Sequence, residues 1–305
     1  MEETLELLTR GVGKHNAQFR IVSINHLEEL KDEIWALIAD RLISEDFFNK
    51  NLGHFKFTKP EELPNTKSII IFAFPQKITE IKFSLHGTNH AAIIPPTYIY
   101  NDVIKACETI LKSLVTESGK GFLRAALPLK LLAVRSGLGK YGRNNLCYVE
   151  GMGSFTRLQA YYTDYHFETD NWQETEMMDR CADCKLCITN CPTGSITFER
   201  TLINAERCLT LYNENEGTFP EWITPHSHNA LVGCMQCQSI CPLNRSLKEK
   251  MEIQEHFNEG ETDMILHRVP FDELPETSQR KLKNLNIDEY YIVLPRNMGV
   301  LFQGK

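Results

Sequence analysis

Eight of the ten cysteines in this 305-residue chain fall into one pattern. The first group is the run Cys-x2-Cys-x2-Cys-x3-Cys-Pro at 181–192, and the second is Cys-x2-Cys-x3-Cys-Pro at 234–242, with Cys208 alone between them. Iron prefers soft thiolate ligands, and this spacing lets one tight loop reach three corners of an iron–sulfur cube. The pattern therefore predicts two [4Fe–4S] clusters, which transfer electrons one at a time.

The last cysteine of each run lies too far along the chain to close the same cube. In two-cluster ferredoxins this cysteine ligates the other cluster, and the proline after it turns the chain away. We therefore predict two crossed sets of ligands. Cluster A takes Cys181, Cys184, Cys187 and Cys241, and cluster B takes Cys191, Cys208, Cys234 and Cys237.

Two other uses of these cysteines fit the pattern less well. Zinc sites commonly use two Cys-x2-Cys pairs separated by a long spacer, and disulfides suit short secreted chains. Cys107 and Cys147 lie outside the pattern and are expected to be buried structural thiols.

Composition limits the class of protein. Hydrophobic residues make up 42% of the chain, and no apolar run approaches the length of a membrane span. The acidic N-terminus shows no secretory signal, so the many thiols indicate a reducing cytoplasm and no membrane partner. The net charge of −7 counts against a large nucleic-acid interface.

Three regions are expected along the chain. Residues 1–175 read as a mixed α/β domain, 176–245 as the cluster module, and 246–305 as a helical tail that packs on the body. The polar stretch 167–180 is expected to be a linker into the cluster module.

Hydrophobic periodicity places several elements in the first region. Residues 26–44 are predicted helical, with Asn25 and Glu28 as a capping box. Further helices are predicted over 100–116 and 127–134, a buried strand over 68–74, and strands over 146–149 and 155–162 joined by a turn.

Residues 137–142 match the pattern Gly-x-Gly-x-x-Gly. A dinucleotide site needs a strand directly before this pattern and an acidic residue about 20 positions later, and neither is evident here. We expect the glycines to form a tight loop where the backbone approaches another large, flat ligand. His86 and His90 are expected in a loop ahead of Pro95-Pro96.

Taken together, these motifs resemble the epoxyqueuosine reductase family, which modifies tRNA and shares its catalytic architecture with reductive dehalogenases. The resemblance is dense from about residue 120 to 245. It rests on Ser-Gly-Leu-Gly-Lys-Tyr-Gly-Arg-Asn-Asn-Leu at 136–146, Gly153-Ser154, the first cysteine run with Thr-Gly-Ser-Ile to 196, Arg207-Cys208-Leu-Thr, and Gly-Cys-x2-Cys-Gln-x2-Cys-Pro-x-Asn-Arg at 233–245.

The resemblance implies an α/β fold. It consists of a nitroreductase-like, cobalamin-binding α+β domain followed by a ferredoxin-like module with two [4Fe–4S] clusters. Electrons would enter at the distal cluster, pass to the proximal one and reduce cobalt, which then acts on the substrate. The residues implied to lie against cobalamin are Gly137, Gly139, Gly142, Arg143, Asn144, Asn145 and Ser154.

The chain departs from the family at two places. Tyr98-Ile-Tyr-Asn101 stands where the family has Arg-Asp-Tyr-His, and Leu123 lies near the place of the aspartate thought to be the general acid. A positioned proton donor contributes roughly 10²–10⁴-fold in rate, so a substitute is required. Tyr98, Tyr100 and His90 are the candidate proton donors.

These departures leave several functions open. The favoured hypothesis is an oxidoreductase that passes electrons from the clusters through cobalamin to a small molecule or a modified tRNA base. The alternative is an electron-transfer protein that activates a corrinoid or other partner and has no substrate of its own. Flavin is a less favoured cofactor for the N-terminal domain, and a flavodoxin- or ferredoxin-type protein is the expected low-potential electron donor.

Overall fold

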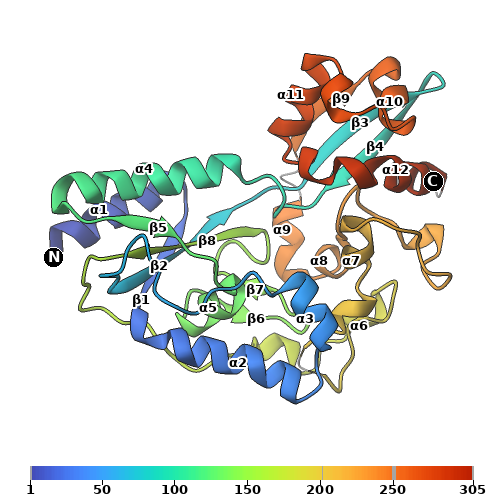
Figure 1. Cartoon of the computed structure of the whole chain (residues 1–305). Coiled ribbons are helices and arrows are strands. Elements are labelled where there is room, and N and C mark those ends of the chain that lie inside the picture. The colour runs from blue at the N-terminus through green and yellow to red at the C-terminus, as the bar shows by residue number, and fades with distance from the viewer. Residues whose placement is uncertain (1, 201, 249–251, 304–305) are drawn as a thin grey trace. The chain divides into compact units, whose positions relative to one another are not determined.

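The computed structural model describes residues 2–200, 202–248 and 252–303. The chain forms two compact units (Figure 1), and each unit joins separate stretches of sequence. The first unit comprises Met1–Pro75 and Asp102–Asp183, and the second comprises Gln76–Asn101 and Cys184–Lys305. This division differs from the consecutive regions 1–175, 176–245 and 246–305 expected from the sequence.

The first unit is built on a four-stranded antiparallel sheet. Its strands are β1 (Gln18–Ser23), β2 (Ser68–Pro75), β8 (Thr156–Thr163) and β5 (Phe122–Arg124), in the order β1-β2-β8-β5. Strand β2 is buried over all its residues except the last, as expected for an apolar run in the middle of a sheet covered on both faces.

Helices cover both faces of this sheet (Figure 1). Helices α1 (Glu2–Gly13) and α4 (Asn101–Ser118) pack on one face, and α2 (Leu27–Ala39) and α5 (Leu129–Arg135) lie on the other. A further helix, α3, spans Glu45–Asn51. The core on the α1/α4 face joins Leu8, Val12, Phe72, Ile110, Leu111 and Tyr161, among others.

The strongly patterned elements of the first unit are confirmed. They are the strand at 68–74 and the helices at 26–44, 100–116 and 127–134, although the first of these helices ends earlier, at Ala39. The predicted capping box is wrong. Ser23 accepts the hydrogen bond from the backbone N–H of Asn25, and the N-cap of α2 is His26, which makes no side-chain cap bond.

The predicted strands 146–149 and 155–162 exist as β7 (Cys147–Tyr148) and β8, but they have different partners. Strand β7 pairs with β6 (Lys140–Tyr141), while β8 joins the main sheet. A single bridge, Val149 to Gly153, closes the turn between them.

The second unit contains a three-stranded sheet in the order β4-β3-β9. Strands β3 (Thr79–Leu85) and β4 (Thr88–Ile94) form a hairpin whose turn, His86-Gly87, has positive φ at both residues (52° and 72°), as a type I′ turn requires. His90 therefore lies in a strand, and the loop predicted there is wrong. Strand β9 (Glu252–Phe257) runs parallel to β3, which joins residues 76–101 to the C-terminal part of the chain.

Helices α10 (Glu259–Leu266), α11 (Glu276–Asn284) and α12 (Leu294–Gln303) complete this unit. Their apolar faces share one core with the sheet and with residues that precede Cys234, including Ile81, Phe83, Leu231, Val232, Leu282 and Met298. Apolar residues between Phe257 and Leu301 are thus part of the core of the second unit.

The segment with the cysteine runs is made of short elements. Its helices are α6 (Leu186–Thr189), α7 (Leu209–Glu214), α8 (Gln236–Ser239) and α9 (Arg245–Lys248). The described residues include 3-10 turns at Ile24–His26, Asp179–Cys181, Ala205–Arg207, Pro225–Ser227, Pro242–Asn244, Phe271–Glu273 and Asp288–Val293. Among the described residues, no helix combines the length and apolar character needed to cross a membrane.

Candidate iron–sulfur site and adjoining loop

The two cysteine runs repeat one backbone geometry fifty residues apart. Helix α6 begins two residues after Cys184 and ends two residues before Cys191. Helix α8 has the same position relative to Cys234 and Cys241. The N–H of Thr189 donates to the carbonyl of Lys185 at 3.0 Å, and that of Ser239 donates to Met235 at 2.7 Å. The two short helices also contact each other. A sequence repeat that folds twice in the same way is what a double-cluster module requires.

The repeat also accounts for the displaced cysteine. The position equivalent to Cys181 is Leu231, which is fully buried in the core of the second unit and cannot act as a ligand. Cys208 instead lies at the N-cap of α7. Burial, with a smaller contribution from the nearby thiols of Cys208 and Cys191, raises the pKa of Cys234 to about 11. Three of the four predicted ligands of cluster B therefore lie close together, which supports the crossed assignment; that assignment stays a prediction.

N–H and O–H groups point at the sulfur atoms of this set. The backbone N–H of Ser195 donates to Sγ of Cys191 at 3.3 Å, and Oγ1 of Thr193 lies 3.7 Å from the same sulfur. The side-chain amide of Asn229 donates to Sγ of Cys234 at 3.3 Å. Donors directed at thiolates stabilise the negative charge of an iron–sulfur cluster.

All ten cysteines are free thiols, so the disulfide alternative does not apply to this structure. Within the described ranges, no three His, Cys, Asp or Glu side chains gather closely enough to hold a single metal ion. A cubane spreads its four thiolates over four iron atoms, so this result concerns mononuclear sites only.

The glycine loop 137–142 connects α5 to the β6–β7 hairpin. A Cβ atom on Gly139 would lie 2.6 Å from Sγ of Cys147, and one on Gly142 would lie 2.4 Å from the ring of Tyr148. These two glycines are therefore required by the packing of the loop on its own hairpin. Gly137 has φ of +67°, a conformation that favours glycine.

Three residues after this loop combine burial with polar groups. Arg143 is 9% exposed, and its Nε and Nη2 both donate to the carbonyl of Cys181, at 3.1 and 3.0 Å. Asn144 is 4% exposed; its Nδ2 donates to the hydroxyl of Tyr148, while its buried Oδ1 has no hydrogen-bond partner in the described part of the chain. Asn145 has φ of +58°, and Ser154 is buried.

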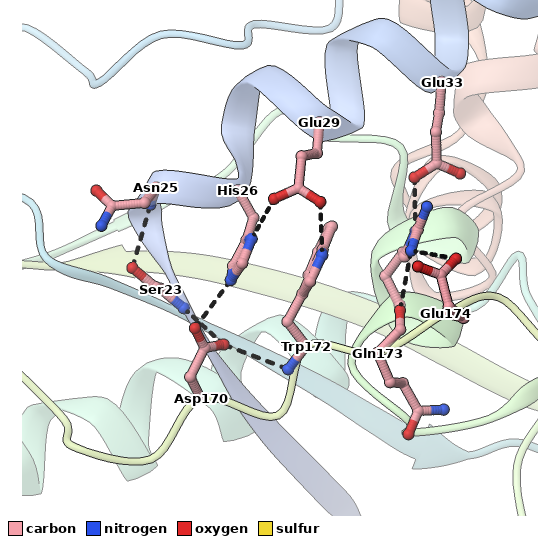
Figure 2. A network of polar contacts seen from close by, with 10 residues as sticks. Ser23, Asn25, His26, Glu29, Glu33, Asp170, Trp172, Gln173 and Glu174 are labelled. Carbon is pink, nitrogen blue, oxygen red and sulfur yellow. Dashed lines mark hydrogen bonds and ion pairs between the residues drawn. The ribbon is translucent and has the colours of Figure 1, made fainter.

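The stretch expected to be a linker is docked on the first unit (Figure 2). The imidazole of His26 lies between the carboxylates of Glu29 (2.7 Å) and Asp170 (2.8 Å) and stacks on Trp172 with ring centroids 4.2 Å apart. Trp172 donates its indole N–H to Glu29. The hydrogen bond from His26 holds the pKa of Glu29 below its ordinary value.

Arg135, the last residue of α5, continues this anchoring. Its guanidinium contacts Glu33 (2.6 Å) and Glu174 (3.1 Å), and its carbonyl accepts from the N–H of Gln173. Farther along, Tyr141 exchanges backbone hydrogen bonds with Glu176 and Met178. Residues 170–181 are thus fixed along the glycine loop, and this places the backbone of Cys181 on Arg143.

The candidate proton donors all lie in the second unit, and each has its own partner. Tyr98 donates its hydroxyl to Glu214, and burial, with the Glu214 carboxylate second, raises the pKa of Tyr98 well above its usual value. Tyr100 donates to Glu289, and His90 stacks on Phe302 at 4.6 Å. A raised pKa makes Tyr98 a weaker acid, which argues against it as the proton donor.

Several polar residues near the cysteines were not singled out from the sequence. Glu214 and Arg296 act through contacts between distant segments, whereas Asn229 bonds to near neighbours in the chain. The polar pair His228-Asn229 ahead of an apolar run is the sequence signal for that site. Both ring nitrogens of His228 are buried without a hydrogen-bond partner among the described residues, and its ring packs edge-on against Phe219 at 4.5 Å. Burial lowers the pKa of His228 to about 4, with Arg296 contributing.

Comparison with known proteins agrees with this geometry. A family described as a 4Fe-4S double cluster binding domain matches residues 180–244. The epoxyqueuosine reductase of Staphylococcus aureus (strain NCTC 8325 / PS 47) is 26% identical over 206 residues, covering 64% of this chain and 53% of the relative. That of Escherichia coli (strain K12) is 35% identical over 147 residues, covering 48% and 38%.

Solved structures show a similar fold. The epoxyqueuosine reductase from Streptococcus thermophilus has a TM-score of 0.71 at 20% identity, covering 100% of this chain and 82% of that one. An epoxyqueuosine reductase crystallised with an epoxyqueuosine-modified tRNA stem loop has a TM-score of 0.68 at 19% identity, covering 99% and 80%. At these identities the likeness shows the fold alone.

The repeated cysteine geometry and the matching domain define a double-cluster iron–sulfur protein of mixed α/β fold. Within that class the chain is similar in sequence to epoxyqueuosine reductases, at 26% and 35% identity in the two relatives above. It spans little more than half the length of the first curated relatives that it matches.

Proposed function

We propose that this protein is an iron–sulfur reductase of the epoxyqueuosine reductase type that also uses cobalamin. Its first unit would be the nitroreductase-like cobalamin domain, and residues 184–245 would form most of the ferredoxin-like module. Cluster A would be held by Cys181, Cys184, Cys187 and Cys241, and cluster B by Cys191, Cys208, Cys234 and Cys237. Homology to the epoxyqueuosine reductases and the double-cluster domain support the proposal.

The observation that carries it is the pair of hydrogen bonds from Arg143 to the carbonyl of Cys181. They tie the first predicted cluster ligand to the loop proposed to hold the second cofactor. An electron carrier and its acceptor must be kept close, and a buried guanidinium on a backbone carbonyl is a rigid way of doing so. Figure 2 shows the adjoining contacts that hold the segment leading to Cys181 in place.

The residues after the glycine loop fit cobalamin in one respect that can be checked. The buried Oδ1 of Asn144 lacks a donor, and the amide side chains at the edge of a corrin can supply one. Arg143, Asn145, Ser154 and the glycines at 137, 139 and 142 would line the same contact. When bound, cobalamin supplies a strongly reducing cobalt centre, while the chain supplies orientation and a proton.

We propose a small molecule or a modified tRNA base as the electron acceptor, a flavodoxin- or ferredoxin-type protein as the electron donor, and the cytoplasm as the location. The net charge of −7 and the altered residues Tyr98 and Leu123 favour the small molecule. Burial raises the pKa of Tyr98 and makes it a weaker acid, so Tyr100 and His90 are preferred to Tyr98 as candidate proton donors.

A second function is favoured by one observation. Leu123 lies in β5 where the family resemblance places a carboxylic acid, so the first unit has no general acid at that position. A chain of this kind can transfer electrons to a corrinoid protein or another partner without reducing a substrate itself. In that case cobalamin would belong to the partner.

Cofactor analysis of anaerobically purified protein separates these functions. We expect eight irons and eight labile sulfides per chain, with one cobalt and no flavin. If the protein holds both clusters but no cobalt, even after incubation with cobalamin, the reductase proposal fails and the electron-transfer function is favoured. Fewer than eight irons, or zinc in their place, would overturn both.

Substrate class can then be tested with the loaded enzyme and a chemical reductant. We expect no conversion of an epoxyqueuosine-containing tRNA stem loop. A small-molecule epoxide or halide should oxidise the reduced protein faster than the stem loop does. Conversion of the stem loop would overturn the preference for a small molecule.

A further inference from the structure

The side-chain amide of Asn229 is held in one orientation. Its Oδ1 accepts from the backbone N–H of Met235 at 2.7 Å, while its Nδ2 donates to the carbonyl of Ser227 at 3.0 Å and to Sγ of Cys234 at 3.3 Å. Because a backbone N–H can only donate and a carbonyl can only accept, the amide cannot be flipped. Asn229 therefore presents a fixed N–H donor to the sulfur of Cys234.

The repeat of fifty residues provides an internal comparison. The position equivalent to Asn229 in the first cysteine run is Asp179, an exposed carboxylate that offers only acceptors. The two runs share the short helix and the spacing of their last three cysteines, and a carboxylate stands at 179 where the amide stands at 229. Asn229 thus gives Cys234 a side-chain N–H donor, whereas the carboxylate at 179 offers none.

We propose that Asn229 raises the reduction potential of the cluster ligated by Cys234, and so makes cluster B the electron acceptor of the pair. The inference rests on the proposed cluster ligation. Reduction adds one electron to the cluster, and the N–H···S hydrogen bond strengthens as the sulfur becomes more negative, so it stabilises the reduced form. A low-potential donor loses that electron, and no proton moves.

Contacts at a second cysteine also favour a higher reduction potential for cluster B. Cys191, a second predicted ligand of cluster B, accepts from the backbone N–H of Ser195 and lies within reach of the hydroxyl of Thr193. Asn229 differs from Ser195 in that its donor belongs to a side chain. A substitution can therefore remove the donor without altering the backbone.

Two substitutions test the proposal. Asn229→Asp keeps an oxygen acceptor for Met235 and introduces the group found at 179, while Asn229→Leu removes the donor at similar size without adding charge. Both are compared with the unaltered protein by redox titration of the two clusters, followed by electron paramagnetic resonance. We expect one midpoint potential to become more negative by about 59 mV. For a one-electron couple this corresponds to a change on the order of tenfold in the ratio of reduced to oxidised cluster. The other potential should not move, and the shift should be larger for Asn229→Asp.

Asn215→Asp is the matched control. It makes the same charge change in the same unit, but the amide of Asn215 donates to the carbonyl of Leu211 at 2.8 Å, not to a cysteine. Unchanged potentials in both Asn229 variants, with eight irons present, would overturn the inference. An equal shift in Asn215→Asp would assign the effect to general charge and overturn it as well.

Loss of one cluster from both Asn229 variants would give this residue a role in assembly and also count against the inference. These outcomes differ from failure of the proposed function, which would show in the unaltered protein as fewer than eight irons.

Discussion

At the scale of single residues, His228 is a buried polar group in the segment that carries the cysteine runs. It is 9% exposed, and neither ring nitrogen has a hydrogen-bond partner in the described ranges. An unsatisfied buried polar group costs about 1–3 kcal/mol, and protonation would add a buried charge beside Arg296. The folded protein therefore keeps this histidine neutral.

His228 should make the protein sensitive to mild acid. Its pKa is about 4 in the folded state and about 6.5 in the unfolded state, so only the unfolded chain gains this proton as the pH falls below about 6.5. Stability is lost between those values, by up to about 3 kcal/mol. His228→Phe should remove this loss, as measured by denaturant unfolding at pH 7.5 and 5.5. The exposed His226→Phe is the control, and equal pH dependence in His228→Phe and the parent would refute the prediction.

Cys107 and Cys147 should be chemically inert. Burial raises the pKa of each to about 12, so at pH 8 a thiolate fraction of about 10⁻⁴ is expected. We expect neither to react with iodoacetamide in the folded protein and both to react in guanidinium chloride, as seen by peptide mass spectrometry. Rapid labelling of either thiol in the folded protein would contradict the burial shown here.

At the scale of elements, the glycine loop gives a matched pair of substitutions. Gly139→Ala would place a Cβ 2.6 Å from both Sγ of Cys147 and the carbonyl oxygen of Tyr148, so we expect a loss of about 1–3 kcal/mol in the free energy of unfolding. Gly13→Ala, in α1, meets no atom within 4 Å and should be neutral or stabilise by up to about 1 kcal/mol. Equal unfolding midpoints for the two variants would show that the loop rearranges to accommodate the added Cβ, and would contradict the prediction.

Elements with strong local patterns were predictable, and those that depend on distant partners were not. The apolar run of β2 and the apolar stripe of α4 can be recognised from the sequence alone. Strand β9 cannot, because it forms through its parallel pairing with β3. The cysteines of the site were read from spacing, which reflects the local wrapping of a cluster. Glu214 was missed because its partner, Tyr98, lies 116 residues away, and Asn229 was missed because the orientation of a loop amide is not encoded in a spacing pattern.

At the scale of the whole molecule, each unit depends on segments that are remote in sequence. Asn297 in α12 is 1% exposed, and its Nδ2 donates to the carbonyls of Asn213 and Leu231, which flank Cys208 and Cys234. The C-terminal helix therefore holds the two segments that carry the predicted ligands of cluster B.

Asn297→Ala would leave two buried carbonyls without donors, which should cost about 2–4 kcal/mol and reduce the iron retained by the protein. Denaturant unfolding and iron analysis measure both effects. Ile292→Ala is the control, because Ile292 is 55% exposed and its truncation should change stability by less than about 0.5 kcal/mol. Full iron content and an unaltered unfolding midpoint in Asn297→Ala would contradict this role.

The parallel pairing of β3 with β9 has a consequence for biosynthesis. A ribosome that has released the β3–β4 hairpin must still make the chain from Ile94 to Glu252 before the third strand exists, which takes on the order of ten to thirty seconds at about 5–20 residues per second. During that interval one edge of the nascent hairpin lacks its partner and is open to other chains. Chaperone capture and late delivery of iron, after translation has passed β9, are the order of events that this topology favours.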